Sequence, residues 1–164
     1  MNRIRKRTAT KRQKSSQSGA NFRRIIVAVD LSPHSEKTAR YAAEFAKRVG
    51  ASITLVHVFP PEPIAEFISE QAHEAFGEVR RRSVWKLAKL MEEVRRTGVE
   101  CGDDLRVGDP AEEVAQAAQN ECADLIITAS HHPGLLGYAV GWGQAPRIMH
   151  RAKCPVLVYH EKAA

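Results

Sequence analysis

The sequence predicts an α/β fold in which a parallel sheet lies between two layers of helices. Short apolar runs of strand length alternate along the chain with segments whose apolar residues recur at helical spacing. Strands that alternate with helices are joined by crossover connections, which make the strands parallel and the crossovers right-handed. With 164 residues, 43% of them hydrophobic, the chain is long enough for one domain with a full core.

The first elements of this pattern are a strand, a helix and a second strand. Residues 24–30 (RIIVAVD) form an apolar run that is typical of a strand buried on both faces. Ser35 is a suitable N-cap for a helix over residues 35–49, which has alanines along one face. Gly50 can end this helix in the left-handed conformation, and residues 51–59 (ASITLVHVF) form the next strand.

A long helical tract is predicted over residues 64–97, with Gly77 as a possible break inside it. The small and apolar residues of one face are expected to point to the core: Ile68, Ala72, Ala75, Val79, Ser83, Leu87, Leu90 and Val94. A weaker strand follows at residues 99–107, and the glycine within it favours a place near the edge of the sheet. Asp109 then caps a helix that runs to about Cys122.

The last stretch, residues 124–160, combines a buried strand, a glycine-rich loop, a short helix and another apolar strand. The glycines of the loop are Gly134, Gly137, Gly141 and Gly143. Pro146 can open the helix, because the N–H that proline lacks is unpaired in the first turn anyway. A strand, a glycine loop and a helix N-terminus in this order are where phosphate-binding sites are commonly built.

Positive charge is concentrated at the N-terminus. Nine of the 25 Lys and Arg residues lie within residues 1–24, and the first acid is Asp30. We therefore expect a basic disordered arm over residues 1–22 and a mildly acidic folded domain over residues 23–162. The arm could bind nucleic acid by charge alone, but no aromatic residues are interleaved among its bases, so nucleic acid is only the second alternative partner. An organelle transit peptide is another interpretation of the arm.

The cysteines and the hydropathy bear on the compartment. Cys101, Cys122 and Cys154 have no CxxC spacing, which indicates reduced thiols that pack as small apolar groups. No apolar run approaches the ~18 residues that a membrane-spanning helix needs. We therefore expect a cytoplasmic protein without a membrane span.

Three segments of the chain resemble the universal stress protein family: residues 25–59, 107–132 and 147–159. The resemblance covers nearly everything outside the arm. It implies a single Rossmann-like domain, of the type called adenine nucleotide alpha hydrolase-like, with a five-stranded parallel sheet in the order 3-2-1-4-5. It also implies a homodimer and a stress-response role without catalysis.

Nucleotide-binding members of this family carry the motif G-x2-G-x9-G-[ST] after the fourth strand. At the four key positions this chain has Ala129, His132, Trp142 and Gly143, all of which depart from the motif. Two of these residues place side chains where a phosphate would need bare backbone, and Gly143 lacks the hydroxyl. The prediction is therefore that no cofactor binds, with ATP binding as the alternative.

If a nucleotide does bind, the resemblance implies which residues hold it. Asp30 matches the acid on the adenosine side, and His57 and Val58 lie on the strand that passes the adenine. The loop residues that would hold the phosphates are Ser130, His131, Gly134, Gly141 and Gly143. In the other interpretation, Asp30 is a turn acid that holds Ser32 and Ser35.

A metal site or a catalytic site has little support. His131 and His132 lie at the tip of the fourth strand, where either role would need further convergent ligands or an orienting partner. The sequence has no His-x3-His or Cys-x2-Cys spacing and no nucleophile elbow. We therefore expect no metal and no catalytic residue.

The last strand is an edge strand in the family's order, and an apolar edge can pair with another chain. The resemblance implies an antiparallel dimer contact through Val156, Leu157, Val158 and Tyr159. We predict a non-enzymatic stress-response or regulatory module that acts through this dimer and through contacts with an unidentified protein. The first alternative is an ATP- or AMP-binding module that uses the crevice at the tips of the first and fourth strands.

Overall fold

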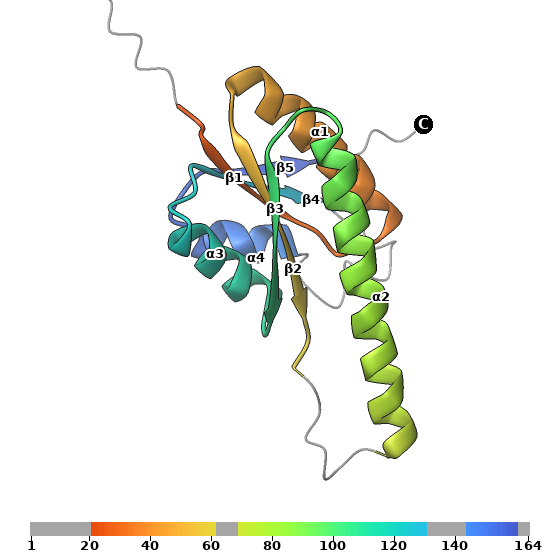
Figure 1. Ribbon diagram of the computed structural model, residues 1–164. Helices are drawn as coiled ribbons and strands as arrows, with labels where there is room; N and C mark the ends of the chain where they lie inside the picture. The colour runs from red at the N-terminus through yellow and green to blue at the C-terminus, as the bar shows by residue number, and fades with distance from the viewer. Residues whose placement is uncertain (1–20, 62–68, 131–143, 161–164) are drawn as a thin grey trace, which may run out of the picture.

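The computed structural model describes residues 21–61, 69–130 and 144–160 (Figure 1). In this part of the chain, five parallel strands form one sheet in the order β3-β2-β1-β4-β5, which confirms the predicted fold class and strand order. The strands are β1 (Arg24–Ala28), β2 (Ser52–Phe59), β3 (Cys101–Val107), β4 (Leu125–Ala129) and β5 (Val156–Tyr159). β1 and β3 are each two residues shorter than the apolar runs predicted for them.

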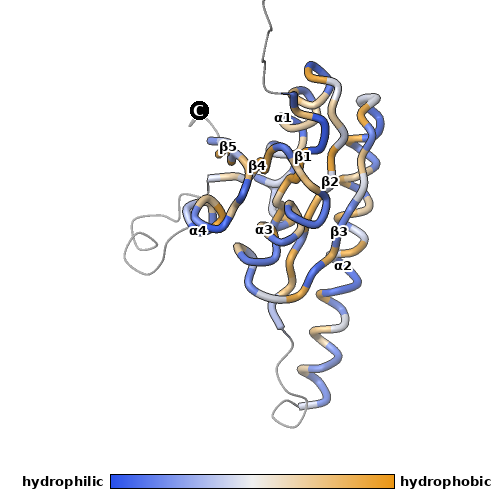
Figure 2. The backbone as a smooth tube through the Cα atoms, turned by 90° about the vertical axis from the view of Figure 1, so that its left-hand side faces the viewer, coloured by the Kyte–Doolittle hydropathy of each residue, from blue (hydrophilic) through white to orange (hydrophobic). Residues whose placement is uncertain are grey.

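Helices cover both faces of the sheet (Figure 1). They are α1 (Pro33–Val49), α2 (Glu70–Arg95), α3 (Pro110–Asn120) and α4 (Gln144–Arg151). α1 and α2 pack on one face, and α3 and α4 pack on the other. Figure 2 shows the hydrophobic strand residues lying between these two layers.

The apolar runs of the central strands follow from this arrangement. Ile25 and Val27 of β1 point to the α1/α2 side, whereas Ile26 points to the α3/α4 side. β4 repeats the pattern, because Ile126 lies opposite Ile26 in the parallel register and Ile127 lies opposite Val27. Since successive strand residues face opposite sides and both sides are covered, the strand must be apolar at every position.

Two of the predicted helix caps are confirmed. Gly50 adopts a left-handed conformation at the C-terminus of α1, with φ at 72°. The side chain of Asp109 accepts a hydrogen bond from the backbone N–H of Glu112 at 3.1 Å and so caps α3. Both caps satisfy backbone groups that a helix end leaves without a partner.

The predicted N-cap of α1 is wrong. α1 begins at Pro33 with Ser32 as its N-cap, so Ser35 lies inside the first turn and is buried. Pro33 is suited to the first helical position because its φ is already helical. This earlier start directs the Ser35 hydroxyl toward Asp30, where it makes a hydrogen bond.

Two expectations for α2 are also wrong. Gly77 does not break the helix, which is continuous from Glu70 to Arg95. The predicted buried face holds only at its C-terminal end, where Leu87, Leu90 and Val94 are buried. Val79 belongs to the same face but is 60% exposed, because the N-terminal part of α2 runs past the ends of β2 and β3 (Figure 1).

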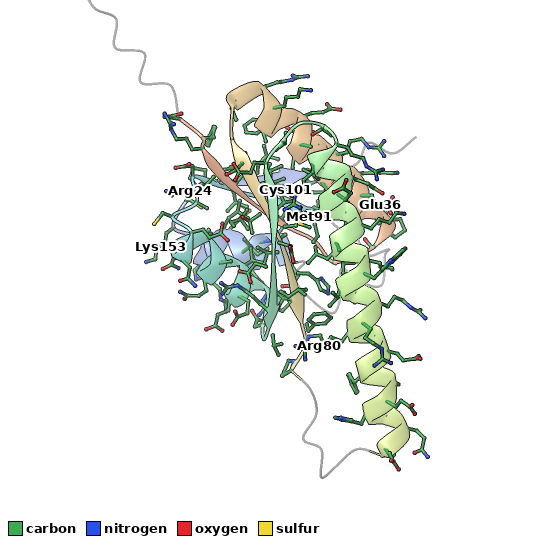
Figure 3. The ribbon with its side chains drawn as sticks, viewed as in Figure 1. Arg24, Glu36, Arg80, Met91, Cys101 and Lys153 are labelled. Carbon is green, nitrogen blue, oxygen red and sulfur yellow. The ribbon has the colours of Figure 1, made fainter. Side chains whose placement is uncertain are left out.

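The cysteines lie in three different environments. Cys101 is buried between β3 and α2, on the side that faces Met91 (Figure 3). Burial raises the pKa of its thiol to about 11, so the thiol is protonated at neutral pH. Cys154 is half-buried, but the expectation that Cys122 packs as an apolar group is wrong. Cys122 is exposed, with φ at 49° just after α3, where the chain needs a left-handed residue to turn into β4.

Candidate functional site

The candidate site lies at the carboxyl ends of β1 and β4. The chain builds β2 and β3 on one side of β1 and then crosses to build β4 and β5 on the other. The strand order therefore reverses between β1 and β4, and in open parallel sheets ligands bind in the crevice outside the strand ends at that point. β1 and β4 are in direct register, with Ala28 opposite Thr128, so Asp30 and Ser130 follow at matching levels.

Asp30 is held in a closed turn between β1 and α1. Its Oδ1 accepts a hydrogen bond from the Ser35 hydroxyl at 2.6 Å and another from the Ser32 backbone N–H at 3.0 Å. The Ser35 oxygen in turn accepts the backbone N–H of Asp30 at 3.0 Å. Ser35 is 3% exposed, so this network is anchored in the packed part of the molecule.

The turn also contains a backbone feature that the sequence did not indicate. Leu31 has φ at 60°, a left-handed conformation that costs a residue with a β-carbon on the order of 1 kcal/mol. The hydrogen bonds of Asp30 on either side offset this cost. The turn acid predicted from the sequence is therefore present, and it fixes the backbone at the mouth of the crevice.

His57 approaches the same turn from β2. Its Nδ1 lies 2.9 Å from the backbone oxygen of Val29, and its ring packs against the edge of Phe59 with centroids 4.7 Å apart. Because a carbonyl oxygen can only accept, Nδ1 is the donor in this hydrogen bond. Val58, next along the strand, points to the α3/α4 side instead.

The structure thus brings together only part of the predicted set. Asp30 and Ser130 follow the ends of the neighbouring strands β1 and β4, and His57 contacts the residue before Asp30. Ser130 donates its backbone N–H to the oxygen of Tyr159 at 2.8 Å, which extends the β4–β5 ladder by one step. The predicted loop residues His131, Gly134, Gly141 and Gly143 lie outside the described residues, as do His132 and Trp142 of the altered glycine motif.

An ion pair links the two helices beside the crevice. Arg147 of α4 donates from Nη2 to Oδ2 of Asp109 at 2.6 Å, and Asp109 also caps α3. The hydrogen bond from Arg147 holds the pKa of Asp109 below its ordinary value. Sequence reasoning missed this pair, because 38 residues separate its members and their spacing carries no signal. α4 begins at Gln144 rather than at Pro146, so the predicted opening residue is the third residue of the helix.

The described part of the chain has neither a metal-binding cluster nor a membrane span. Within residues 21–61, 69–130 and 144–160, no group of three His, Cys, Asp or Glu side chains could hold a metal ion. In the same ranges, no helix has both the length and the hydropathy of a membrane span. Most of the predicted basic arm, residues 1–20, lies outside these ranges. Phe22, at the end of the predicted arm, packs against Phe45 of α1 with ring centroids 5.7 Å apart.

β5 forms one edge of the sheet. Tyr159 stacks on Tyr41 of α1, with ring centroids 4.9 Å apart, which fixes the end of the strand. Ile126 donates its N–H to the oxygen of Pro155, and Ser130 donates to that of Tyr159. In a parallel ladder these partners alternate, so the odd-numbered residues of β5 bond to β4. The backbone N–H and C=O groups of Val156 and Val158 therefore point away from the sheet.

Comparison with known proteins agrees with this geometry. The sequence profile of the Universal stress protein family matches residues 21–160. The chain belongs to the universal stress protein family. It is 33% identical over 139 residues to a universal stress protein of Thermus aquaticus, an alignment that covers 84% of this chain and 98% of the relative. A universal stress protein of Methanocaldococcus jannaschii, called MJ0531, is 27% identical over 147 residues and covers 87% of this chain and 85% of its own.

Solved structures share the fold. The hypothetical protein MJ0577 matches with a TM-score of 0.74 at 23% identity, covering 88% of this chain and 99% of its own. A universal stress protein in complex with cAMP matches with a TM-score of 0.66 at 18% identity, covering 85% and 98%. A universal stress protein of Archaeoglobus fulgidus in complex with dAMP matches with a TM-score of 0.58 at 22% identity, covering 84% and 98%.

Proposed function

We propose that this protein is a non-catalytic regulatory module of the stress response that works as a homodimer joined through β5 and binds no ATP. Proteins of its family are generally non-enzymatic stress-response proteins and commonly form homodimers, although ATP-binding members exist. The observation that carries the dimer is the edge strand β5, whose outward backbone groups at Val156 and Val158 face away from β4. An apolar edge of this kind is a template for pairing with another chain.

The composition of β5 supports self-pairing. Val156 to Tyr159 contains no charged residue, and all four side chains are half-buried. Two such strands placed antiparallel exchange their outward N–H and C=O groups and continue the sheet across the two subunits. The contact also buries apolar side chains on both faces of the joined sheet, because neighbouring residues of β5 face opposite sides.

Proline substitution tests this contact directly. Val158→Pro removes the outward N–H of β5 and leaves the ladder to β4 intact, so we expect a loss of dimer in sedimentation equilibrium. The matched control is Leu105→Pro on β3, the other edge, which removes an equivalent outward N–H and should leave the mass unchanged. A Val158→Pro protein that folds normally and keeps the wild-type mass would contradict the proposed dimer.

The proposal that the protein does not bind ATP rests on the altered glycine motif. His132 and Trp142 stand at positions where nucleotide-binding relatives have glycine, so the triphosphate lacks bare backbone to contact. We expect no shift of the thermal midpoint on addition of ATP with magnesium. A saturable rise at micromolar nucleotide would contradict this part of the proposal.

Binding of an adenine mononucleotide is the second candidate function. It is supported by the structural neighbours in complex with cAMP and dAMP, and by Asp30 and His57, since the His57 ring contacts the backbone oxygen of Val29, the residue before Asp30. A mononucleotide needs fewer phosphate contacts than ATP. Isothermal titration with AMP tests this candidate. Asp30→Ala is expected to abolish the heat of binding. The control Asp109→Ala lies outside the crevice between β1 and β4 and is expected to keep it.

A further inference from the structure

The side of α2 that points away from the sheet carries a stripe of ordered charge. Its residues recur at spacings of four or three, so they lie on one face of the helix: Glu70, Glu74, Glu78, Arg81, Trp85 and Lys89. All six residues are exposed. The opposite face of the helix holds Leu87, Leu90 and Val94, which are buried against the sheet. The stripe is thus the solvent side of α2.

Much of this stripe lies on a part of α2 that projects from the domain. The guanidinium carbon of Arg80 lies 5.8 Å from the ring centroid of Phe59, the last residue of β2 (Figure 3). α2 begins at Glu70, and its first turns run beyond this level (Figure 1). These turns contain Gly77, which disfavours a helix by about 1 kcal/mol relative to alanine. A projecting helical segment with a glycine in it would be stabilised by a partner.

Large apolar residues are exposed on the same helix. Trp85 is 65% exposed and Val84 is 44% exposed. The ammonium group of Lys89 lies 5.9 Å from the Trp85 ring centroid. Exposed tryptophan is uncommon on a free surface and is enriched where one protein binds another.

The order of charges along α2 indicates what covers this face. Residues 70–78 contain three acids and no Lys or Arg, whereas residues 79–89 contain five bases and no acid. A second copy of α2 laid antiparallel, with the centre between residues 79 and 80, places each acidic block on a basic block. Glu78 of one copy then lies at the level of Arg81 of the other, and Glu74 at the level of Trp85. A parallel arrangement would place like charges together instead.

We propose that two copies of this protein associate through the solvent face of α2 in this antiparallel arrangement. The contact is separate from β5, because α2 packs beside β3 and β2 whereas β5 forms the far edge of the sheet. Both contacts can therefore form at once, and together they build an assembly larger than a dimer. Because the blocks are exposed charges, salt weakens the association.

Charge exchange tests the proposal on the full-length protein. In one variant every charge of the stripe is basic (Glu70→Lys, Glu74→Lys and Glu78→Lys), and in the other every charge is acidic (Arg81→Glu and Lys89→Glu). In sedimentation equilibrium at low salt, each variant alone should have half the wild-type mass, and an equimolar mixture should regain the full mass. Neither variant alters β5, so this doubling is expected whether or not the β5 dimer forms.

A neutral variant covers the case in which the charge variants lose helix by circular dichroism. Trp85→Ala should weaken the association about tenfold, as expected for an interface tryptophan. The matched control is Met149→Ala on α4, a residue that is 55% exposed, which should have no effect. A mixture of folded charge variants that does not double in mass, or a Trp85→Ala protein that associates like the wild type, would overturn the proposal.

Discussion

The two edges of the sheet are built differently. β3 has seven residues and carries three charged ones, Asp103, Asp104 and Arg106. Ile53 donates to the oxygen of Glu100, and Gly108 donates to that of Phe59, so the even-numbered residues bond to β2. The oxygen of Cys101 therefore points outward, and Arg95 of α2 donates to it from Nε at 2.7 Å.

β5 has none of these features. It is four residues long, carries no charge and is held from the side by the stack of Tyr159 on Tyr41. Charged side chains and covered backbone groups are how proteins protect an edge from pairing. The difference supports the proposal that pairing with a second chain uses β5 and not β3. The predictions below alter one edge at a time.

The largest effect is expected at the ion cluster of β3. Arg106 bridges Asp104 at 2.7 Å and Glu113 of α3 at 3.3 Å, with 18% of the arginine side chain exposed. Arg106→Ala leaves two partly buried carboxylates close together without a cation. We expect a loss of about 2 kcal/mol in the free energy of unfolding, measured in urea, with no change in oligomeric mass. A neutral outcome would mean that the cluster does not stabilise this edge.

The next effect concerns the protection of β3 itself. Arg95→Ala removes the donor to the outward oxygen of Cys101, for an expected cost of about 1.5 kcal/mol. It also uncovers a backbone acceptor on the edge, so we expect more concentration-dependent light scattering than for the wild type. Arg96→Ala is the matched control and should not increase the scattering, because the Nε of Arg96 pairs with exposed Glu92 at 3.5 Å rather than with the edge of the sheet.

A smaller effect is expected at β5. Tyr41→Ala removes the ring that stacks on Tyr159, which should cost about 1 kcal/mol beyond the lost buried area. Because this ring positions the end of β5, we also expect the proposed dimer to be weaker, so that it dissociates at a higher protein concentration than the wild type. Tyr41→Phe keeps the stack and should restore both properties; if it does not, the hydroxyl rather than the ring is responsible.

The smallest effect is electrostatic and depends on pH. The pKa of Asp109 is lowered by its hydrogen bond from Arg147, so the charged carboxylate stabilises the fold at neutral pH. This contribution is lost as the pH falls below about 4, where the group protonates in the unfolded and then in the folded chain. Asp109→Asn keeps the cap and removes the charge. It should lower stability by about 0.5 kcal/mol at neutral pH in urea titrations, with no difference near pH 2.

The helix caps and core faces illustrate which features can be read from sequence. Asp109 followed by Pro110, and Gly50 after a run of alanines, are local signals that the structure reproduces. The buried face of α2 could be predicted only in part. The apolar periodicity of α2 extends in the N-terminal direction to Val79, but the helix has passed the end of the sheet at that point. Residues of the same face are therefore buried at the C-terminal end of α2 and exposed at Val79.

The candidate site divides in the same way. That Asp30 ends a strand at the crevice follows from the alternation of strands and helices. The sequence offers two starts for the helix that follows: Ser35 as the N-cap, or Pro33 as the first helical residue, which is the one that the structure has. The Arg147–Asp109 pair could not be predicted, since it depends on how α3 and α4 pack.

The sequence by itself determined the order of the elements, the apolar faces of the central strands and the family, because hydrophobic periodicity and turn residues act over a few neighbouring positions. Only the tertiary structure decided which backbone groups of the edge strands point outward, where α2 leaves the sheet and which charges meet across helices. These features depend on the register and length of elements that are distant in sequence, and no local pattern records them.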